Sequence, residues 1–347
     1  MRLMADVRTR RRWLAECLGV LGAIGTTSAF GSLTAGCDRH EAPATTAVPA
    51  TENAAENAAE KKRIVIGVSQ SNLGEPYRVQ MNADLAQYAA AHPELSLVFK
   101  DAQNDSLRQR AQVEELVAQG IELLLISPKE SAPLTAPVAA AHAHGIPVIV
   151  IDRRVEGDKF TTFVGADNRR IGRAAGRWAV QALGGKGKIV ELEGLMTSSP
   201  ARERHEGFWA GVERAKHPGI EPIFEADTAW LEPNARREME SALARHARID
   251  LVYAHNDPAA HGAYLAAKAA GREREMKFIG IDALPHEGVR YVREGALDVT
   301  FQYSTCAKEA IELALDVLAR KPVPKELILG TRMFDKASLE SGGTAVE

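Results

Sequence analysis

Residues 146–153 read Ile-Pro-Val-Ile-Val-Ile-Asp-Arg, an apolar run that ends directly in an acidic and a basic side chain. Two further stretches have the same form. Residues 276–283 read Met-Lys-Phe-Ile-Gly-Ile-Asp-Ala, and residues 251–257 read Leu-Val-Tyr-Ala-His-Asn-Asp. Apolar runs of this length predict parallel strands that are buried on both faces. Because ligands of open α/β sheets bind beyond the carboxyl ends of such strands, the runs predict a ligand site built from Asp, Arg and Asn.

Strand-like and helix-like stretches alternate through the rest of the chain from Arg63 onward. The predicted strands are 63–69, 95–100, 121–126, 146–151, 161–164, 187–192, 220–225, 249–254, 276–281 and 297–303. The predicted helices are 77–91, 106–119, 131–144, 168–183, 200–215, 232–246, 257–270 and 304–319. Such alternation predicts an α/β fold with parallel sheets and right-handed crossovers. A chain of this length favours two sheets over one, because a single core of this size tends to split.

The domain organisation that follows has two doubly wound parallel-sheet lobes. We expect the first lobe at 62–166 plus 304–330, the second at 167–303, and a C-terminal segment and tail at 331–347. The final predicted helix has no strand left to pair with in the second lobe, so it is expected to return to the first. The chain would then cross between the lobes near Ala166, Tyr303 and Gly330. A hinge with three crossings permits closure while limiting twist.

The N-terminus is typical of an export signal at 1–36. Basic residues between Arg2 and Arg12 precede an apolar stretch that is interrupted by glycines. Leu33-Thr-Ala-Gly-Cys37 then resembles a lipoprotein cleavage box in which Cys37 becomes acylated. The alternative is a chance cysteine near the cleavage site. Thr9 to Leu14 also resembles a twin-arginine signal, so the export route stays open between that pathway and the general one.

Composition narrows the function further. Residues 37–61 are rich in Ala, Thr, Glu and Pro and predict a flexible, lipid-anchored tether. A net charge of −3 gives no reason to expect nucleic acid as a partner. Beyond Cys17 and Cys37 the chain has only Cys306, which predicts neither an internal disulfide nor a metal site built on cysteine. We expect no cofactor and no metal.

Nine short motifs, in order along residues 62 to about 330, resemble the periplasmic sugar-binding proteins of bacterial ABC importers. This family, of the ribose- and galactofuranose-binding type, shares the effector fold of the LacI repressors, the type I periplasmic binding protein fold. The motifs are Gly67–Gln70, Ala102–Asp105, Ile126–Pro128, Ile151–Arg153, Gly165–Asn168, Glu191–Gly194, Ala201–Phe208, Ala254–Asp257 and Gly280–Asp282. Their order and spacing are specific for the fold and class and only weakly specific for the ligand.

The resemblance implies which residues contact the ligand. It assigns contacts to Ser69, Asp152, Arg153, Arg204, Asn256 and Asp282. Carboxylates accept hydrogen bonds from sugar hydroxyls, and a guanidinium donates in a fixed fork. The alternative for Asp152 and Arg153 is a structural ion pair at the end of a strand. Asp257 is interpreted instead as the N-cap of the helix that follows it.

The aromatic positions of the family are only partly kept. Tyr77 matches one ring of the first loop, and Arg78 stands where the ribose-binding pattern has a second, as in the galactofuranose-binding branch. Glu75 would accept from a hydroxyl or pair with Arg78. Trp230 would face Tyr77 from the second lobe and complete an aromatic sandwich, or else pack in the core. Gln302 and Tyr303 lie where the family has a contacting glutamine, and the register between them stays open.

The predicted function is capture of a monosaccharide or related polyol and its delivery to the membrane subunits of an ABC permease. We expect a monomer that touches the membrane only through its lipid anchor. A Gly-x-Ser-x-Gly elbow and a Walker-type loop are both missing from the sequence, so we do not expect an enzyme. The alternatives are a receptor that presents its closed form to a chemoreceptor or sensor kinase, and a binder of a non-sugar such as a cyclitol or furanone.

Overall fold

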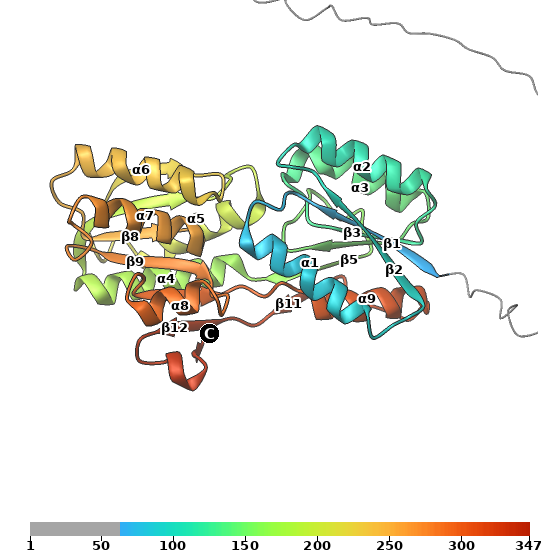
Figure 1. The fold of residues 1–347 in the computed structure, drawn as a ribbon. Coiled ribbons are helices and arrows are strands. Elements are labelled where there is room, and N and C mark those ends of the chain that lie inside the picture. Colours follow the sequence, from blue (N-terminus) through green and yellow to red (C-terminus); the bar gives the residue numbers. More distant parts are fainter. Residues whose placement is uncertain (1–62) are drawn as a thin grey trace, which may run out of the picture. The chain divides into compact units, whose positions relative to one another are not determined.

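A computed structural model describes residues 63–347 (Figure 1). The expected export signal, Cys37 and the tether lie outside the described residues. Within residues 63–347 the chain forms two α/β lobes, each built around one sheet. No helix in this range has both the length and the apolar content that a membrane span requires.

The first sheet has the strand order β11-β5-β4-β3-β1-β2, and its neighbouring strands are parallel. Its strands are β1 (Ile64–Gln70), β2 (Leu95–Asp101), β3 (Leu123–Ile126), β4 (Val148–Ile151), β5 (Thr162–Ala166) and β11 (Glu326–Leu329). Its helices are α1 (Pro76–Ala89), α2 (Ser106–Ala118), α3 (Ser131–Ala143) and α9 (Ala307–Leu318). Helices α2 and α3 cover one face of the sheet, and α1 and α9 cover the other (Figure 1).

The second sheet has the order β13-β12-β10-β9-β8-β6-β7. Its strands are β6 (Lys186–Glu193), β7 (Gly219–Asp227), β8 (Leu251–Ala254), β9 (Lys277–Asp282), β10 (Val299–Gln302), β12 (Arg332–Asp335) and β13 (Thr344–Ala345). Its helices are α4 (Asn168–Leu183), α5 (Ser199–Val212), α6 (Glu232–Arg245), α7 (Asp257–Ala269), α8 (Gly288–Glu294) and the short η1 (Leu339–Ser341). The β10–β12 and β12–β13 pairs are antiparallel, whereas the other neighbouring strands of this sheet are parallel.

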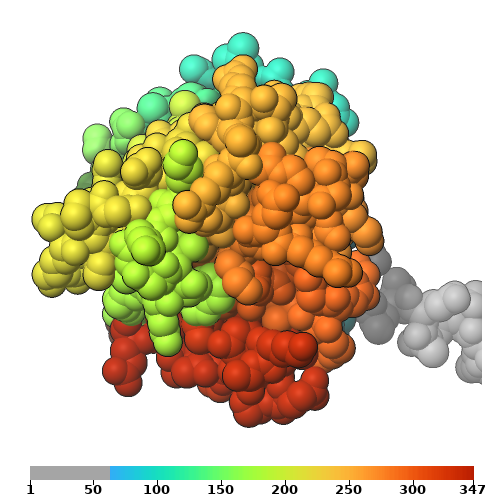
Figure 2. All heavy atoms as spheres, turned by 90° about the vertical axis from the view of Figure 1, so that its left-hand side faces the viewer, coloured from blue at the N-terminus to red at the C-terminus, as the bar shows by residue number. Residues whose placement is uncertain are grey.

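The α/β class and the two parallel sheets are confirmed, and each predicted strand and helix has a counterpart. The structure adds elements that the sequence pattern did not predict, namely α8, β11 and the elements of the last seventeen residues. The sequence predicted only a C-terminal segment and tail at 331–347; in the structure this segment forms strands, in which β12 pairs with β10 and β13 with β12. Figure 2 shows these C-terminal residues (red) packed along the face of the second lobe. These short strands owe their place to tertiary pairing rather than to a strong local pattern.

The chain passes between the sheets at three places in the described range. It leaves β5 of the first sheet for α4, leaves β10 of the second for α9, and continues from β11 directly into β12. Helix α9 packs against α1, β3 and β4, so it belongs with the first lobe in space. The carboxyl ends of β1, β3 and β4 and those of β8 and β9 lead into the loops described below.

Helix α5 packs very closely against α4, and this contact fixes the position of α5 and of the side chains that it carries. Gly172 and Gly176 of α4 face Gly207 and Gly211 of α5, and a Cβ on any of the four would overlap backbone atoms of the opposite helix. Only glycine lets two helices approach this closely. Buried apolar side chains on both faces of each sheet complete the packing, among them Leu125, Ile149 and Ile279.

Candidate ligand-binding site

A cavity lies where loops from both lobes meet, at the carboxyl ends of the strands. It holds about 250 Å³ of space, including the part open to solvent. It is lined by Glu75, Tyr77, Arg78, Asp152, Arg153, Pro200, Arg204, Trp230, Asn256, Asp282 and Tyr303. The structure therefore brings together all of the predicted contact residues except Ser69 and Gln302.

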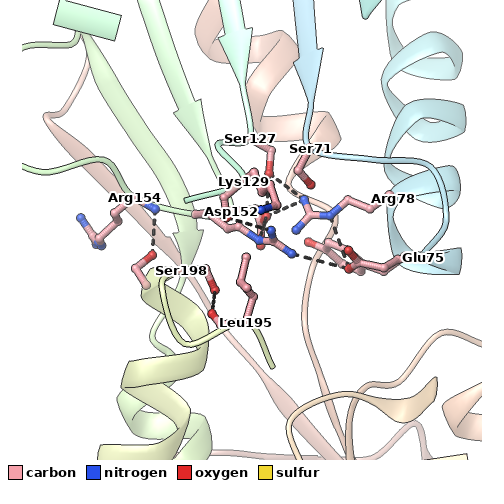
Figure 3. Close-up of polar contacts among 12 residues, drawn as sticks. Ser71, Glu75, Arg78, Ser127, Lys129, Asp152, Arg154, Leu195 and Ser198 are labelled. Carbon is pink, nitrogen blue, oxygen red and sulfur yellow. Dashed lines mark hydrogen bonds and ion pairs between the residues drawn. The ribbon is translucent and has the colours of Figure 1, made fainter. Parts of the chain in front are cut away.

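The first lobe contributes a buried cluster of charges around Asp152. One Asp152 oxygen, Oδ2, accepts from Arg78 Nη1 at 2.6 Å and from Ser127 Oγ at 2.8 Å. Arg153 lies beside it, with Nε 3.7 Å from the same oxygen. Glu75 Oε2 is 3.7 Å from Arg78 Nε and 3.6 Å from Arg153 Nη2. Figure 3 shows Arg78 reaching from α1 to Ser127 and Asp152 at the ends of β3 and β4.

Arg78 and Asp152 stabilise each other's ionised form, although burial disfavours both charges. Burial alone would raise the pKa of Asp152, but the neighbouring Arg78 and Arg153 and the Ser127 hydroxyl together lower it. Burial opposes the charge of Arg78 as well, and Asp152 and Glu75 outweigh that cost and raise its pKa. Arg153 differs, because burial and then the adjacent Arg78 lower its pKa. Both arginines are therefore cationic donors next to an ionised Asp152.

The second lobe contributes Arg204, which α5 carries into the cavity. Its Nε donates to Asn168 Oδ1 at 2.9 Å, and its Nη1 donates to the backbone oxygen of His255. The guanidinium lies over the ring of Tyr303 at 4.5 Å and over that of Trp230 at 5.4 Å. Stacking on two rings fixes the plane of a guanidinium, so its remaining donors face the cavity in a defined direction.

Asp282 faces Arg204 across the cavity at 4.0 Å, between Oδ1 and Nη1. Burial raises the pKa of Asp282 well above its usual range; Arg204 offsets part of this effect and Asp257 adds to it. Asp257 is not the N-cap that the sequence predicted. Asn256 caps α7 by accepting from Ala259 N, while the Asp257 carboxylate accepts from Ala283 N and from Thr300 Oγ1. Asp257 thus supports the loop that carries Asp282.

Three aromatic rings line the cavity. The hydroxyl of Tyr77 donates to Ser304 O and that of Tyr303 to Asp152 O, and the two rings are 5.5 Å apart. Both rings are therefore fixed against the hinge side of the cavity. Trp230 enters from the loop before α6 with a φ of 70° and is only 4% exposed. The guanidinium of Arg153, from the other lobe, lies 5.3 Å from its ring.

Some donors of the cavity residues are unused. Within residues 63–347, Arg78 Nε, Arg153 Nε and Trp230 Nε1 are buried and have no hydrogen-bond partner. A buried donor without an acceptor costs about 1–3 kcal/mol. The arrangement therefore fits an occupant that is rich in acceptor oxygens.

Ser69 does not line the cavity, and of Gln302 and Tyr303, between which the sequence left the register open, only Tyr303 does. Ser69 Oγ instead accepts from Gln109 Nε2 at 3.2 Å, on the side of β1 that faces α2. Neighbouring residues of an extended chain point to opposite sides, and Tyr303 rather than Gln302 takes the cavity side. Pro200 lines the cavity and was missed, because a proline in the first turn of a helix gives no sign of a binding role.

Contacts outside the cavity also join the lobes. The backbone N of Arg154 donates to Ser199 Oγ at 2.8 Å, and Ser131 N donates to Thr197 O at 3.2 Å. Figure 3 shows the backbone nitrogen of Arg154 beside the start of α5, close to Ser198, while the Arg154 side chain points away from that helix. The conformation seen here is therefore a closed one in which the loop before α5 meets the first lobe.

Comparison with known proteins agrees with this geometry. Residues 66–322 match the family model for the periplasmic binding protein domain. The ribose import binding protein of Bacillus subtilis is 32% identical over 78% of this chain and 87% of its own length. That of Escherichia coli is 30% identical over 82% and 96%.

Solved structures show the same fold. The fructose-binding periplasmic domain of a hybrid two-component system is 44% identical, with a TM-score of 0.78 over 80% of this chain and 93% of that one. An ABC transporter solute-binding protein from Bacillus halodurans with bound myo-inositol is 29% identical, with a TM-score of 0.75 over 82% and 98%. These proteins are named for binding and transport rather than for catalysis, and the family implies a periplasmic or extracellular location. By the family match over most of its length, the chain belongs to the periplasmic binding protein family.

Proposed function

We propose that this protein captures a monosaccharide or related polyol between its lobes and delivers it to the membrane subunits of an ABC permease, without chemical change. The observation that carries the proposal is the cavity itself, in which Arg78, Arg153 and Arg204 alternate with three carboxylates over aromatic rings. A sugar offers hydroxyls that both donate and accept, together with apolar C–H faces that stack on rings.

The lining of the cavity favours a small polyhydroxylated ligand, because charged donors and acceptors stand close together among aromatic rings. Three arginines and the carboxyl groups of Glu75, Asp152 and Asp282 line the cavity together, so a neutral polyhydroxylated ligand can both accept from and donate to its walls. The unused donors of Arg78, Arg153 and Trp230 would pair with its oxygens.

Transport would follow from closure. A ligand that contacts Asp152 and Arg153 on one lobe and Arg204 and Asp282 on the other binds the closed form better than the open form, and it shifts the population accordingly. We propose that the lobes at 62–166 plus 304–330 and at 167–303 are the two moving bodies. The closed monomer would then be the form that the permease recognises.

Sensing is the second candidate function. It is favoured by one observation, the 44% identity to the fructose-binding periplasmic domain of a hybrid two-component system. In that case the closed form would be presented to a sensor kinase instead of a permease. The myo-inositol bound to the Bacillus halodurans structure keeps a cyclitol among the candidate ligands.

A thermal-shift screen tests the binding proposal. Purified protein would be heated with fructose, ribose, other aldoses, myo-inositol and sugar acids, and hits would be measured by calorimetry. Ligand at about 100 times its Kd stabilises the native state by about 2.7 kcal/mol, which moves Tm by several degrees. A panel in which no sugar or polyol shifts Tm would contradict the proposal. The ligand-saturated protein would then be tested for binding to an ABC permease in vesicles and, separately, to a sensor kinase. Binding to the permease favours transport, and binding to the kinase favours sensing.

Anchoring is proposed on the sequence alone. We propose that Cys37 is the acylated N-terminus of the exported protein, reached by the general or the twin-arginine route. Stable attachment needs two lipid chains, since one gives only marginal binding. Cys37→Ala should move the protein from the membrane fraction to the soluble fraction. An unchanged membrane fraction would contradict anchoring and leave export untouched.

A further inference from the structure

A buried polar network lies directly behind the second-lobe half of the cavity. At its centre is Glu191 of β6, whose side chain is fully buried. Its Oε2 accepts from Trp209 Nε1 at 2.7 Å, and its Oε1 is 2.9 Å from His255 Nε2 and 3.1 Å from His205 Nδ1. His255 is fully buried as well, at the end of β8. None of these side chains lines the cavity.

The hydrogen bonds define the tautomer of His255. The backbone N–H of Gly194 lies 3.1 Å from His255 Nδ1, and a backbone N–H can only donate. Nδ1 is therefore the unprotonated nitrogen, and the proton is on Nε2, where it is donated to Glu191. Glu191 thus selects the tautomer that can accept from Gly194.

Two hydrogen bonds connect His255 to residues that line the cavity, one through its backbone oxygen and one through its ring nitrogen Nδ1. Its backbone oxygen accepts from Arg204 Nη1. Gly194, held by His255 Nδ1, lies flat against the Trp230 ring, so that a Cβ at this position would overlap the ring atoms Cζ2, Cη2 and Cζ3. His255 therefore binds Arg204 directly and holds Trp230 in place through Gly194. The next residue in the chain, Asn256, also lines the cavity.

We propose that His255 is a positioning residue for ligand binding, which in its Nε2-protonated tautomer holds Gly194 and thereby sets the place of the Trp230 ring. The proposal rests on the proposed function, because it concerns affinity at the same cavity. It assigns to His255 and Glu191 a role in ligand affinity although neither lines the cavity.

The charged groups around His255 determine what acid does to the network. They are Glu191 on β6 and Arg204 and His205 on α5. Burial lowers the pKa of His255 in spite of Glu191, so the ring is neutral at neutral pH. The hydrogen bonds from His205 and His255 hold the pKa of Glu191 at about 2 although burial opposes its charge, and Glu191 stays ionised in acid. A second proton on His255 must therefore go to Nδ1, where it replaces the hydrogen bond from Gly194.

Two substitutions at the same position separate the two nitrogens. In His255→Asn the amide oxygen can occupy the place of Nδ1 and accept from Gly194. In His255→Gln the amide nitrogen can occupy the place of Nε2 and donate to Glu191, but the acceptor for Gly194 is lost. We expect His255→Gln to raise the Kd for the best sugar of the screen about tenfold, and His255→Asn to raise it less than about threefold.

The pH profile gives a readout that a merely structural role would not move. Wild-type affinity should fall in acid, and this loss should be smaller in both variants because neither has an imidazole to protonate. Glu240→Gln, which removes an exposed partner of Arg236 on α6, serves as the control with wild-type affinity. Equal Kd values for the two variants, or an undiminished loss of affinity in acid, would overturn the proposal.

A measurement on the wild-type protein keeps the test independent of how well the variants fold. The imidazole ¹⁵N shifts of His255 should show a protonated Nε2 and an unprotonated Nδ1 at neutral pH, and the opposite tautomer would overturn the proposal. If the wild-type protein binds no sugar or polyol at all, it is the proposed function that fails. If it binds and the substitutions behave alike, only the role of His255 fails.

Discussion

Asp152 shows how much of the candidate site depends on one residue's conformation and charge. Its φ of 63° turns the chain at the end of β4, so that its carboxylate lies between Arg78 and Arg153 instead of continuing the strand. Asp and Asn adopt this left-handed region more readily than most residues. One position therefore supplies both the turn and the counter-charge for two buried arginines.

Replacing Asp152 by Asn keeps the turn and removes the charge. We expect Asp152→Asn to weaken sugar binding by about 2–5 kcal/mol, because Arg78 and Arg153 lose their shared anion in a buried site. Calorimetry with the ligand from the screen measures this loss. Glu326→Gln, which removes an exposed partner of Arg154, is the control and should cost less than about 1 kcal/mol. Affinity within twofold of wild type in Asp152→Asn would place this carboxylate outside the binding energetics.

Gly194 and Trp230 form a second test at the residue scale. Gly194→Ala should displace the Trp230 ring, because the new Cβ overlaps its far edge, and should weaken binding by about 1–3 kcal/mol through overpacking. In a Trp230→Phe background the smaller ring leaves room, so the cost of Gly194→Ala should shrink. A double-mutant cycle by calorimetry measures this coupling. Strictly additive costs would show that the ring and the glycine do not constrain each other.

At the scale of elements, α5 links the cavity to the contact between the lobes. The same helix carries Arg204 into the cavity and begins with Ser199, whose hydroxyl accepts from Arg154 N of the first lobe. Its glycine contact with α4 leaves it little freedom to shift. When the lobes close, the contact between α5 and the first lobe and the approach of Arg204 to the ligand should therefore form together.

Ser199→Ala removes one hydrogen bond that exists only when the lobes are closed. We expect Kd to rise about three- to tenfold, mainly through a faster koff, because about 0.5–1.5 kcal/mol is lost from the closed form. Stopped-flow dissociation measures the effect. Ser198→Ala is the matched control, since its hydroxyl donates to Leu195 O within its own loop. Equal dissociation rates for the two variants would mean that the contact does not stabilise closure.

At the scale of the whole molecule, the pKa values of buried and half-buried carboxyl groups are shifted in opposite directions. Burial raises the pKa of Glu193 and of Glu287 to about 7 and that of Asp257 to about 6. Asp152 and Glu191 have lowered pKa values, because their cationic and hydrogen-bonding partners outweigh burial. As pH falls, the folded state therefore protonates Glu193, Glu287 and Asp257 at a higher pH than usual, and Asp152 and Glu191 at a lower pH than usual.

The stability of the protein should accordingly pass through a maximum near pH 5. Between pH 8 and 5 the folded chain binds protons at Glu193 and Glu287 that the unfolded chain, with an ordinary pKa of 4.5, does not yet bind, so stability rises as pH falls. Below about pH 4 the unfolded chain binds protons that Glu191 and Asp152 resist, so stability falls. Tm measured against pH should vary by several degrees, and Glu193→Gln should flatten the upper limb. A Tm that rises steadily from pH 5 to 8 would contradict this assignment.

Much of the fold and part of the site could be predicted from the sequence, because these features follow from local patterns. Apolar runs such as 146–151 predict buried strands, and a polar residue directly after such a run must lie at the edge where ligands bind. That rule found Asp152, Arg153, Asn256 and Asp282 without coordinates. The resemblance to a family added Arg78, Arg204 and Trp230, which no periodicity identifies.

Tertiary structure decided what depends on partners distant in the chain. Side-chain direction and pairing made Tyr303 rather than Gln302 a lining residue, and they made Asn256 rather than Asp257 the helix cap. The strand at 332–335 forms because β10 offers it an edge, and His255 carries its proton on Nε2 because Glu191, 64 positions away in the chain, accepts a hydrogen bond from that nitrogen. Local sequence fixes which conformations a segment prefers, whereas burial and hydrogen-bond partners, which select among them, come only from the folded chain.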